Sequence, residues 1–399
     1  MLVWSDTRNA LMNAEYWAVG ASSPSPLPLA HADVSKHLVA DWVPSLPAAV
    51  STSLMGWPVH LLDIDSSAGV DFLALGDEAR GGERQWNGVL SWMLGVVGAR
   101  HVLESEGYLW VAPMSAFYPE ARRAVDISKW HPMYPRCRLK AHPSPTSSSR
   151  LRPDYVAIRP RTLGSDWAVA EAKGTTKRLT KMGACPPNWR DQSRNVVLES
   201  AGRELRVPRH LVVATRSNPS ARYTKTRRVQ IRAWNSEAEA AAPDDLRVEV
   251  AAAHLFGLCR NLGLRKNAVA LALATAARRE AESRLFGRRG LDDAVEAVAD
   301  DAEAELEARP LASDDIEEGE VTRTIDSAFG PVEVRIEAPI LRLVRALRIR
   351  TDPQAAAAAV DDAEEALNPP LLTQGEALGR GSARLPSGVR VSIPRLLEG

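Results

Sequence analysis

Two carboxylates and one lysine occur at a spacing that could support metal-dependent chemistry on a phosphodiester. Asp154 precedes the short apolar run at residues 155–158, and Glu171 and Lys173 close a second apolar run that begins at Trp167. Hard divalent cations such as Mg²⁺ prefer oxygen ligands, and a bound cation polarises a phosphate and lowers the pKa of a bound water. A lysine beside such a pair can neutralise charge on the phosphate. These residues therefore predict hydrolysis of a phosphodiester bond.

Both parts of this motif are expected on neighbouring β-strands. Side chains on a strand alternate between its two faces, so Glu171 and Lys173 project to one side while Ala172 projects to the other. Residues 159–166 contain a proline and a glycine and suit a hairpin connection of the longer kind. If the two strands pair, Asp154 can approach Glu171 at the end of the sheet. The three charged side chains are then expected to converge on one shared ion.

Apolar spacing predicts the elements on either side of these strands. Residues 83–102 carry apolar side chains at helical intervals and predict a helix, followed by a strand at residues 108–113. The residues between 113 and 149 are rich in Pro and Ser and predict a long loop. A second helix is predicted at residues 189–201, and a buried strand at residues 210–215. The order helix, strand, strand, strand, helix, strand predicts an α/β fold with a mixed sheet flanked by helices.

The motif residues resemble the PD-(D/E)XK nuclease superfamily, which has the restriction-endonuclease-like fold. The match consists of a Pro-Asp pair ending at Asp154, 16 intervening residues and the triplet from Glu171 to Lys173, and the resemblance covers about residues 77–235. It implies that Asp154 and Glu171 are the metal ligands and that Lys173 is the catalytic lysine. It also implies Mg²⁺ as the cofactor, with Mn²⁺ as a substitute.

The resemblance implies two further catalytic residues. Many members carry an acidic residue on the helix before the sheet, and Glu83 stands near the start of that helix here. Some members carry a glutamine on the helix after the lysine strand, which corresponds to Gln192. The tyrosine that often follows four residues later is Val196 in this chain, so this part departs from the family pattern.

The net charge of +0 hides a strongly basic central part of the chain. Residues 136–232 hold 22 Lys and Arg residues against 6 Asp and Glu, a net charge of +16, whereas residues 1–135 carry −6 and residues 233–399 carry −10. A local excess of this size is typical of a surface that binds a polyanion, although a solvated basic surface paired with the acidic flanks would also explain it. The basic residues expected to contact phosphates are Lys177, Arg178, Lys181, Arg222, Lys225, Arg227 and Arg228.

Composition and missing motifs argue against several other classes of protein. The longest apolar runs are shorter than the roughly 20 residues of a membrane span, and the N-terminus lacks the apolar core of an export signal. The three cysteines lie far apart and indicate free thiols in a reducing cytoplasm. The sequence has no phosphate-binding loop, no Cys/His zinc spacing and no nucleophile-elbow serine. We therefore expect a cytoplasmic protein without a membrane partner.

The chain divides into three predicted parts. Residues 1–76 are expected to form an N-terminal α/β or irregular extension, residues 77–235 the nuclease-like domain, and residues 245–399 an acidic, mainly helical region with short strands. Within this last part, the alanine run at residues 355–359 is expected to be exposed. The C-terminal helices are expected to form a homo-oligomer, to bind a partner protein or to regulate the nuclease.

The predicted activity is that of a Mg²⁺-dependent endonuclease acting on nucleic acid, with DNA favoured over RNA. The resemblance to nucleases that carry extra helical domains implies a role in bacterial anti-phage defence. Two alternatives remain open at the level of sequence. One is a catalytically idle nucleic-acid-binding or assembly module, and the other is a transposase or recombination subunit of the same fold.

Overall fold

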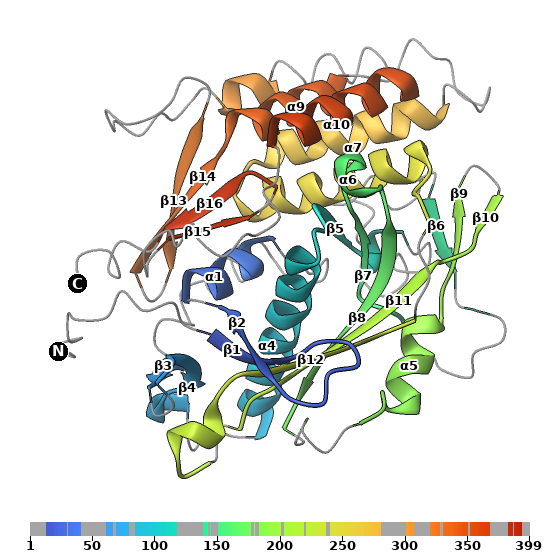
Figure 1. Ribbon diagram of the computed structural model, residues 1–399. Helices are drawn as coiled ribbons and strands as arrows, with labels where there is room; N and C mark the ends of the chain where they lie inside the picture. Colours follow the sequence, from blue (N-terminus) through green and yellow to red (C-terminus); the bar gives the residue numbers. More distant parts are fainter. Residues whose placement is uncertain are drawn as a thin grey trace.

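The computed structural model of the chain is an α/β structure built around one large mixed sheet (Figure 1). The residues that it describes are 13–29, 31–40, 61–66, 69–79, 84–117, 139–142, 144, 151–176, 179, 183–200, 203–218, 221–236, 240–280, 301–306, 320–327, 330–349, 352–367, 382–385 and 387–392. Within these ranges, none of the helices is both long enough and apolar enough to cross a bilayer.

Nine strands of the described chain form the large sheet, and they come from the N-terminal and central parts of the sequence. Their spatial order is β3 (Leu62–Asp65), β4 (Phe72–Leu75), β1 (Asn13–Trp17), β12 (Gln230–Asn235), β11 (Arg209–Arg216), β8 (Trp167–Thr175), β7 (Tyr155–Ile158) and β5 (Trp110–Pro113), with β2 (Ser25–Pro28) paired to β1. Because β1 pairs in parallel with β12, the N-terminal strands continue the central sheet.

Strands β7 and β8 carry the motif residues and lie next to each other. They pair antiparallel with Tyr155 opposite Ala170, and β8 pairs in parallel with β11. Parallel neighbours need a crossover connection, and the one between β8 and β11 contains helix α5 (Pro187–Arg194). The order α4 (Arg84–Ser105), β5, β7, β8, α5, β11 agrees with the predicted order of elements, with the short strands β6, β9 and β10 added between them.

The side chains of β7 alternate between two separate hydrophobic cores. Tyr155 and Ala157 belong to the core that helix α4 covers, whereas Val156 and Ile158 belong to the core on the opposite face, which helix α6 (Asp244–Asn261) covers. A strand buried on both faces reads as a continuous apolar run, and this explains why β7 lacks polar residues.

Helix α4 lies unusually close to the sheet because glycines replace side chains where they meet. A Cβ atom on Gly95 of α4 would lie 2.6 Å from the backbone nitrogen of Gly174 in β8. A Cβ atom on Gly174 would in turn overlap the carbonyl oxygen of Ser91. The contact places α4 directly against the end of β8, one residue beyond Lys173.

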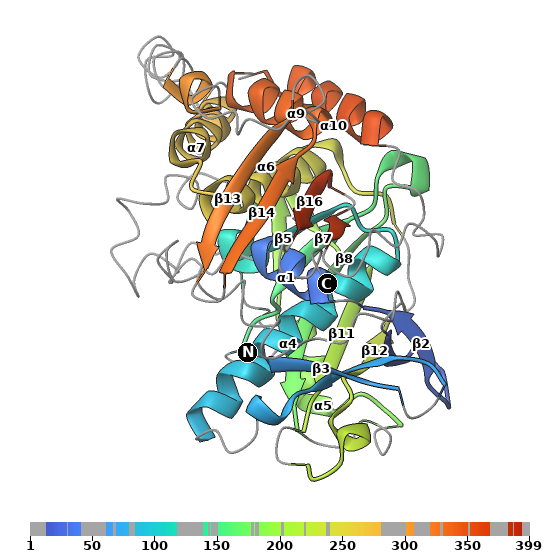
Figure 2. The same ribbon diagram turned by 90° about the vertical axis from the view of Figure 1, so that its left-hand side faces the viewer.

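The C-terminal helices cover the part of the sheet near the edge strand β5 (Figures 1 and 2). They are α6, α7 (Arg265–Glu280), α9 (Ala338–Ile349) and α10 (Pro353–Leu367). Glu364 of α10 is 2% exposed and accepts hydrogen bonds from Trp110 Nε1 at 2.8 Å, from the Arg161 backbone nitrogen at 2.9 Å and from Arg247 at 2.7 Å. This carboxylate therefore joins the C-terminal part to the sheet edge and to helix α6.

Two smaller sheets flank the large one. The first has the order β10 (Arg203–Leu205), β9 (Val197–Ser200), β6 (Leu139–His142), and the second has the order β13 (Val321–Ser327), β14 (Gly330–Ile336), β16 (Val389–Ser392), β15 (Ser382–Leu385). Helix α1 (His31–Ala40) contacts α4 on one side and strands β15 and β16 on the other. A segment from the N-terminal region thus lies between the central helix and the last strands of the chain.

Two predictions about local structure were wrong. The helix expected at residues 189–201 ends at Arg194, because residues 197–200 form β9, whose partner β6 lies in the segment predicted as a loop. The alanine run at residues 355–359 was expected to be exposed, but Ala356 is 0% and Ala359 5% exposed. Helix α10 packs against α6 and α9 and so buries this face.

Candidate active site

Asp154 and β8 are tied together by backbone geometry. Asp154 immediately precedes β7, and its backbone nitrogen donates to the Ala170 carbonyl oxygen at 3.0 Å. Its carboxylate accepts a hydrogen bond from the Ala172 backbone nitrogen, with Oδ2 at 2.8 Å. The Asp154 side chain is therefore fixed against the strand segment that carries Glu171 and Lys173, as the sequence predicts.

Strand β8 presents Glu171 and Lys173 to the face opposite helix α4. Ala172, between them, packs against the α4 core, as the alternation of side chains predicts. The Glu171 side chain is 1% exposed, and its Oε1 lies 2.6 Å from Lys173 Nζ. The Lys173 side chain is 20% exposed, so the lysine is the member of the pair that solvent reaches.

Burial of Glu171 beside a second carboxylate has a clear electrostatic effect. Burial raises the pKa of the Glu171 carboxyl to about 9, and the negative charge of Asp154 contributes in the same direction, although Lys173 opposes both. Glu171 Oε2 is buried, and no donor among the described residues forms a hydrogen bond with it. Hard divalent cations prefer oxygen ligands, so these two adjacent carboxylates are candidate ligands for such an ion.

Gln192 of helix α5 completes the site on the side of Lys173. Its Oε1 accepts a hydrogen bond from Lys173 Nζ at 2.6 Å, and its Nε2 donates to the Arg152 carbonyl oxygen at 2.8 Å. Gln192 is 6% exposed, so neither hydrogen bond competes with much solvent. The structure therefore brings together four of the predicted catalytic residues: Asp154, Glu171, Lys173 and Gln192.

The predicted phosphate-contacting residues separate into three groups. Lys177, Arg178 and Lys181 lie outside the described residues, as does the predicted catalytic residue Glu83. Arg222 and Lys225 are exposed, and the Arg222 guanidinium lies 5.9 Å from the centre of the Tyr223 ring. These two side chains remain accessible to a nucleic acid.

Arg227 and Arg228 form the third group, and both are buried. Arg227 is 3% exposed and lies 2.9 Å from Asp77 Oδ1. Arg228 is 4% exposed and forms ion pairs with Asp65 at 2.5 Å and with Glu15 at 3.1 Å. The expectation that Arg227 and Arg228 contact phosphates does not fit this burial, because their guanidinium groups join the turn before β12 to the N-terminal strands.

A second cluster of polar side chains lies between helices α1 and α4, and sequence reasoning did not identify it. It consists of His37, His101 and Glu104, which are all buried. The only local signal is that His101 and Glu104 are three residues apart, which places them on the same face of a helix. His37 is 64 residues away from His101 in the chain, so no short motif joins the three residues.

Comparison of the chain with protein-family models, with curated proteins and with solved structures gave no match.

Proposed function

We propose that the protein is a metal-dependent nuclease that hydrolyses phosphodiester bonds, with DNA as the favoured substrate. The observation that carries the proposal is the convergence of Asp154, Glu171 and Lys173 at the end of β8. Two carboxylates in contact, one of them buried, are costly to ionise together unless a cation lies between them. The lysine beside them, which pairs with Glu171, would neutralise charge on a bound phosphate.

The arrangement of the elements supports the same proposal. Strands β5, β7 and β8 are antiparallel neighbours, β11 is parallel to β8, and α4 and α5 pack on opposite faces of β8 and β11. We propose that these elements form a restriction-endonuclease-like core, in line with the sequence resemblance to PD-(D/E)XK nucleases. The further proposal of a role in anti-phage defence depends on that resemblance alone.

Each residue of the site has a defined part in the proposed reaction. Asp154 and Glu171 would hold Mg²⁺, with Mn²⁺ as a substitute, and the bound ion supplies charge neutralisation at the phosphate and a more acidic water. Lys173 would place its ammonium group beside the scissile phosphate and stabilise the negative charge that develops there. Gln192 would keep Lys173 in that position through its 2.6 Å hydrogen bond.

The substrate would reach this site across the basic central part of the chain. Residues 136–232 carry a net charge of +16, and the exposed Arg222 and Lys225 belong to this stretch. Tyr223 lies between them and is 67% exposed, so its ring is available to stack on a base. A polyanionic substrate is the partner that this charge distribution favours.

The test is cleavage of supercoiled plasmid, linear duplex DNA and single-stranded RNA by the purified full-length protein, in Mg²⁺ and in EDTA. We expect Mg²⁺-dependent cleavage that falls by at least about 100-fold in Lys173→Ala, because one charge-stabilising group is removed. Lys266→Ala is the matched control, since this exposed lysine of helix α7 pairs with the exposed Asp301. Cleavage that survives Lys173→Ala would contradict the proposal, and binding without cleavage by the wild type would favour the catalytically idle alternative.

A further inference from the structure

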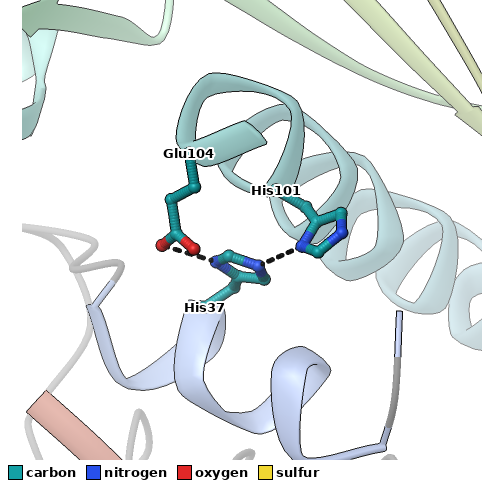
Figure 3. A group of neighbouring side chains, drawn as sticks. All are labelled: His37, His101 and Glu104. Atoms are coloured by element: carbon teal, nitrogen blue, oxygen red, sulfur yellow. Dashed lines mark hydrogen bonds and ion pairs between the residues drawn. The ribbon is translucent and has the colours of Figure 1, made fainter. Parts of the chain in front are cut away.

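The cluster between helices α1 and α4 lies apart from the proposed nuclease site and has a different set of donor atoms. His37 comes from α1, and His101 and Glu104 come from α4. Figure 3 shows the His37 ring lying between the Glu104 carboxylate on one side and the His101 ring on the other. The three residues are 0%, 5% and 6% exposed, so water does not solvate their polar atoms freely.

Three polar contacts connect the cluster from end to end. His101 Nε2 lies 2.5 Å from the Pro28 carbonyl oxygen, and His101 Nδ1 lies 3.0 Å from His37 Nε2. His37 Nδ1 lies 3.3 Å from Glu104 Oε1. The carbonyl and the ionised carboxylate are acceptors only, so the imidazoles must supply every proton in these contacts.

The number of protons falls one short of the number of contacts. Each neutral imidazole carries a single N–H, so two rings supply two protons for three contacts. If His101 donates to Pro28 and His37 donates to His101, then His37 Nδ1 faces Glu104 without a proton. The alternative tautomer of His37 satisfies Glu104 but leaves His37 Nε2 and His101 Nδ1 facing each other with their lone pairs. A third arrangement, in which His101 Nδ1 donates to His37 Nε2, leaves His101 Nε2 facing Pro28 without a proton. In every arrangement one contact remains that an additional cation would complete, and His37 Nδ1 has no hydrogen-bond partner among the described residues.

Lys36 does not lie between His37 and Glu104, because its ammonium group pairs with the other oxygen of the Glu104 carboxylate. Its Nζ lies 2.9 Å from Asp33 and 3.1 Å from Glu104 Oε2, and it donates to the Arg384 carbonyl oxygen at 3.1 Å. It therefore orients one oxygen of Glu104 and leaves Oε1 turned toward His37.

We propose that His37, His101 and Glu104 bind a divalent transition-metal ion, with Zn²⁺ as the best match, and that this ion joins helix α1 to helix α4. One ligand atom from each residue can be chosen so that all three lie within 4.8 Å of one another. Two nitrogen ligands at about 2.0–2.1 Å from a tetrahedral zinc ion are about 3.3 Å apart, so His37 Nε2 and His101 Nδ1, now 3.0 Å apart, would bind one ion after a small movement of the rings. The Glu104 carboxylate now faces Nδ1 on the other side of the His37 ring and would have to turn toward the ion to become the third ligand. The Pro28 carbonyl fixes the tautomer of His101 that leaves Nδ1 free to bind a metal.

The ligand set distinguishes this site from the one at Asp154 and Glu171. Imidazole nitrogens favour zinc and its neighbours in the first transition row, whereas a site made only of carboxylate oxygens favours Mg²⁺ or Mn²⁺. Helix α1 also contacts β15 and β16, so an ion at this place would stabilise the docking of α1 between the central helix and the last sheet. The site is thus structural and separate from the proposed chemistry.

The test is zinc content and thermal unfolding of the full-length chain in an Asp154→Asn background, which weakens any binding at the carboxylate pair. After equilibration with ZnCl₂ and desalting, we expect about one zinc ion per chain and a Tm that is at least about 3 °C higher than in EDTA. His37→Gln and Glu104→Gln are expected to lose the ion and the Tm shift. His210→Gln is the control, because this histidine lies on β11 and its ring contacts Ser193 instead.

X-ray absorption on the zinc-loaded chain without cluster mutations gives a readout that does not depend on how well the variants fold. We expect a first shell near 2.0–2.1 Å with the scattering signature of two imidazoles. Zinc retained unchanged by His37→Gln, or a first shell without imidazole, would overturn the proposal. An identical Tm in ZnCl₂ and EDTA together with no retained zinc would also overturn it.

Discussion

Lys173 Nζ lies 2.6 Å from Gln192 Oε1, although the two residues are 19 positions apart in the chain. Lys173 belongs to strand β8 and Gln192 to helix α5. The same amide donates to the carbonyl oxygen of Arg152, two residues before Asp154. One glutamine therefore connects the lysine of β8 with the segment that leads into β7. The position of the lysine relative to Asp154 therefore depends on Gln192.

Replacement of Gln192 should impair the chemical step more than substrate binding. In Gln192→Leu we expect kcat to fall by about 10- to 100-fold while KM changes little, because Lys173 loses the acceptor that holds it in place. Gln192→Glu keeps an acceptor for Lys173 but loses the donor to Arg152, so we expect a smaller loss. Steady-state cleavage kinetics on a defined duplex would separate the two. Equal loss in both variants would show that the acceptor is not what matters.

Metal binding at Asp154 and Glu171 should become tighter as the pH rises. In the metal-free protein the pKa of Glu171 is about 9, so Mg²⁺ must displace its proton at neutral pH. We expect the Kd for Mg²⁺ to fall by about tenfold per pH unit between pH 6 and 8, with about one proton released per ion. Titration calorimetry in buffers of different ionisation enthalpy measures that proton directly. A Kd independent of pH would mean that Glu171 is not a ligand.

The same raised pKa should make the metal-free protein less stable at high pH. Folded Glu171 keeps its proton up to about pH 9, whereas the unfolded residue releases it near 4.5, so the unfolded state binds fewer protons between these values. The contribution of Glu171 is therefore fully present below about pH 4.5 and is lost as the pH rises to about 9. Urea denaturation in EDTA at pH 6, 7 and 8 should show this decline in the wild type. Glu171→Gln should remove that part of the slope.

The basic residues near β12 should differ in what their loss affects. Removing Arg222 and Lys225 together should remove about one phosphate contact per residue. The slope of log K for DNA binding against log salt concentration should then become less steep by about 0.9 for each residue, with little effect on stability. Arg228→Met should instead lower the free energy of unfolding by about 3–5 kcal/mol, because Asp65 and Glu15 would lose the buried guanidinium group that pairs with both. Its salt slope should match that of the wild type. A lower slope for Arg228→Met would restore it as a phosphate contact.

Two glycines of helix α4 offer a matched test of how closely the helix lies against β8. A Cβ atom on Gly88 would meet nothing within 4 Å, so Gly88→Ala should raise the free energy of unfolding by about 0.5–1 kcal/mol. A Cβ atom on Gly95 would lie 2.6 Å from the Gly174 nitrogen, so Gly95→Ala should lower the free energy of unfolding by about 1–3 kcal/mol. Urea denaturation measures both. Stabilisation by both alanines would argue against the close approach.

Local sequence was sufficient to predict the elements whose pattern reflects their own burial. The strand at residues 155–158 was predicted with the bounds that the structure shows, because both of its faces are covered and it carries only apolar side chains. The end of α5 was not predicted. Val196, Val197 and Leu198 fit the spacing of a helix and of a strand equally well. Residues 197–200 form strand β9 because they pair with β6, which lies more than 50 residues earlier in the chain.

The same distinction applies to the functional residues. Asp154, Glu171 and Lys173 could be predicted to converge because they lie on strands joined by a short connection. The burial of Arg228 could not, because its partner Asp65 is 163 residues away and no pattern near Arg228 indicates an acidic neighbour. The cluster around His37 was missed for the same reason, since only the packing of α1 on α4 brings its members together.

Helix α6 and the Glu364 carboxylate have a practical consequence for anyone who tries to isolate the proposed catalytic core. A chain shortened to its first 235 residues would lose the cover over Val156 and Ile158 and would leave the indole N–H of Trp110 without its acceptor. The proposed catalytic residues therefore lie in a shorter segment than the one whose hydrophobic core is complete. Loss of activity in a truncated chain would then reflect misfolding and poor solubility and not the loss of a catalytic residue.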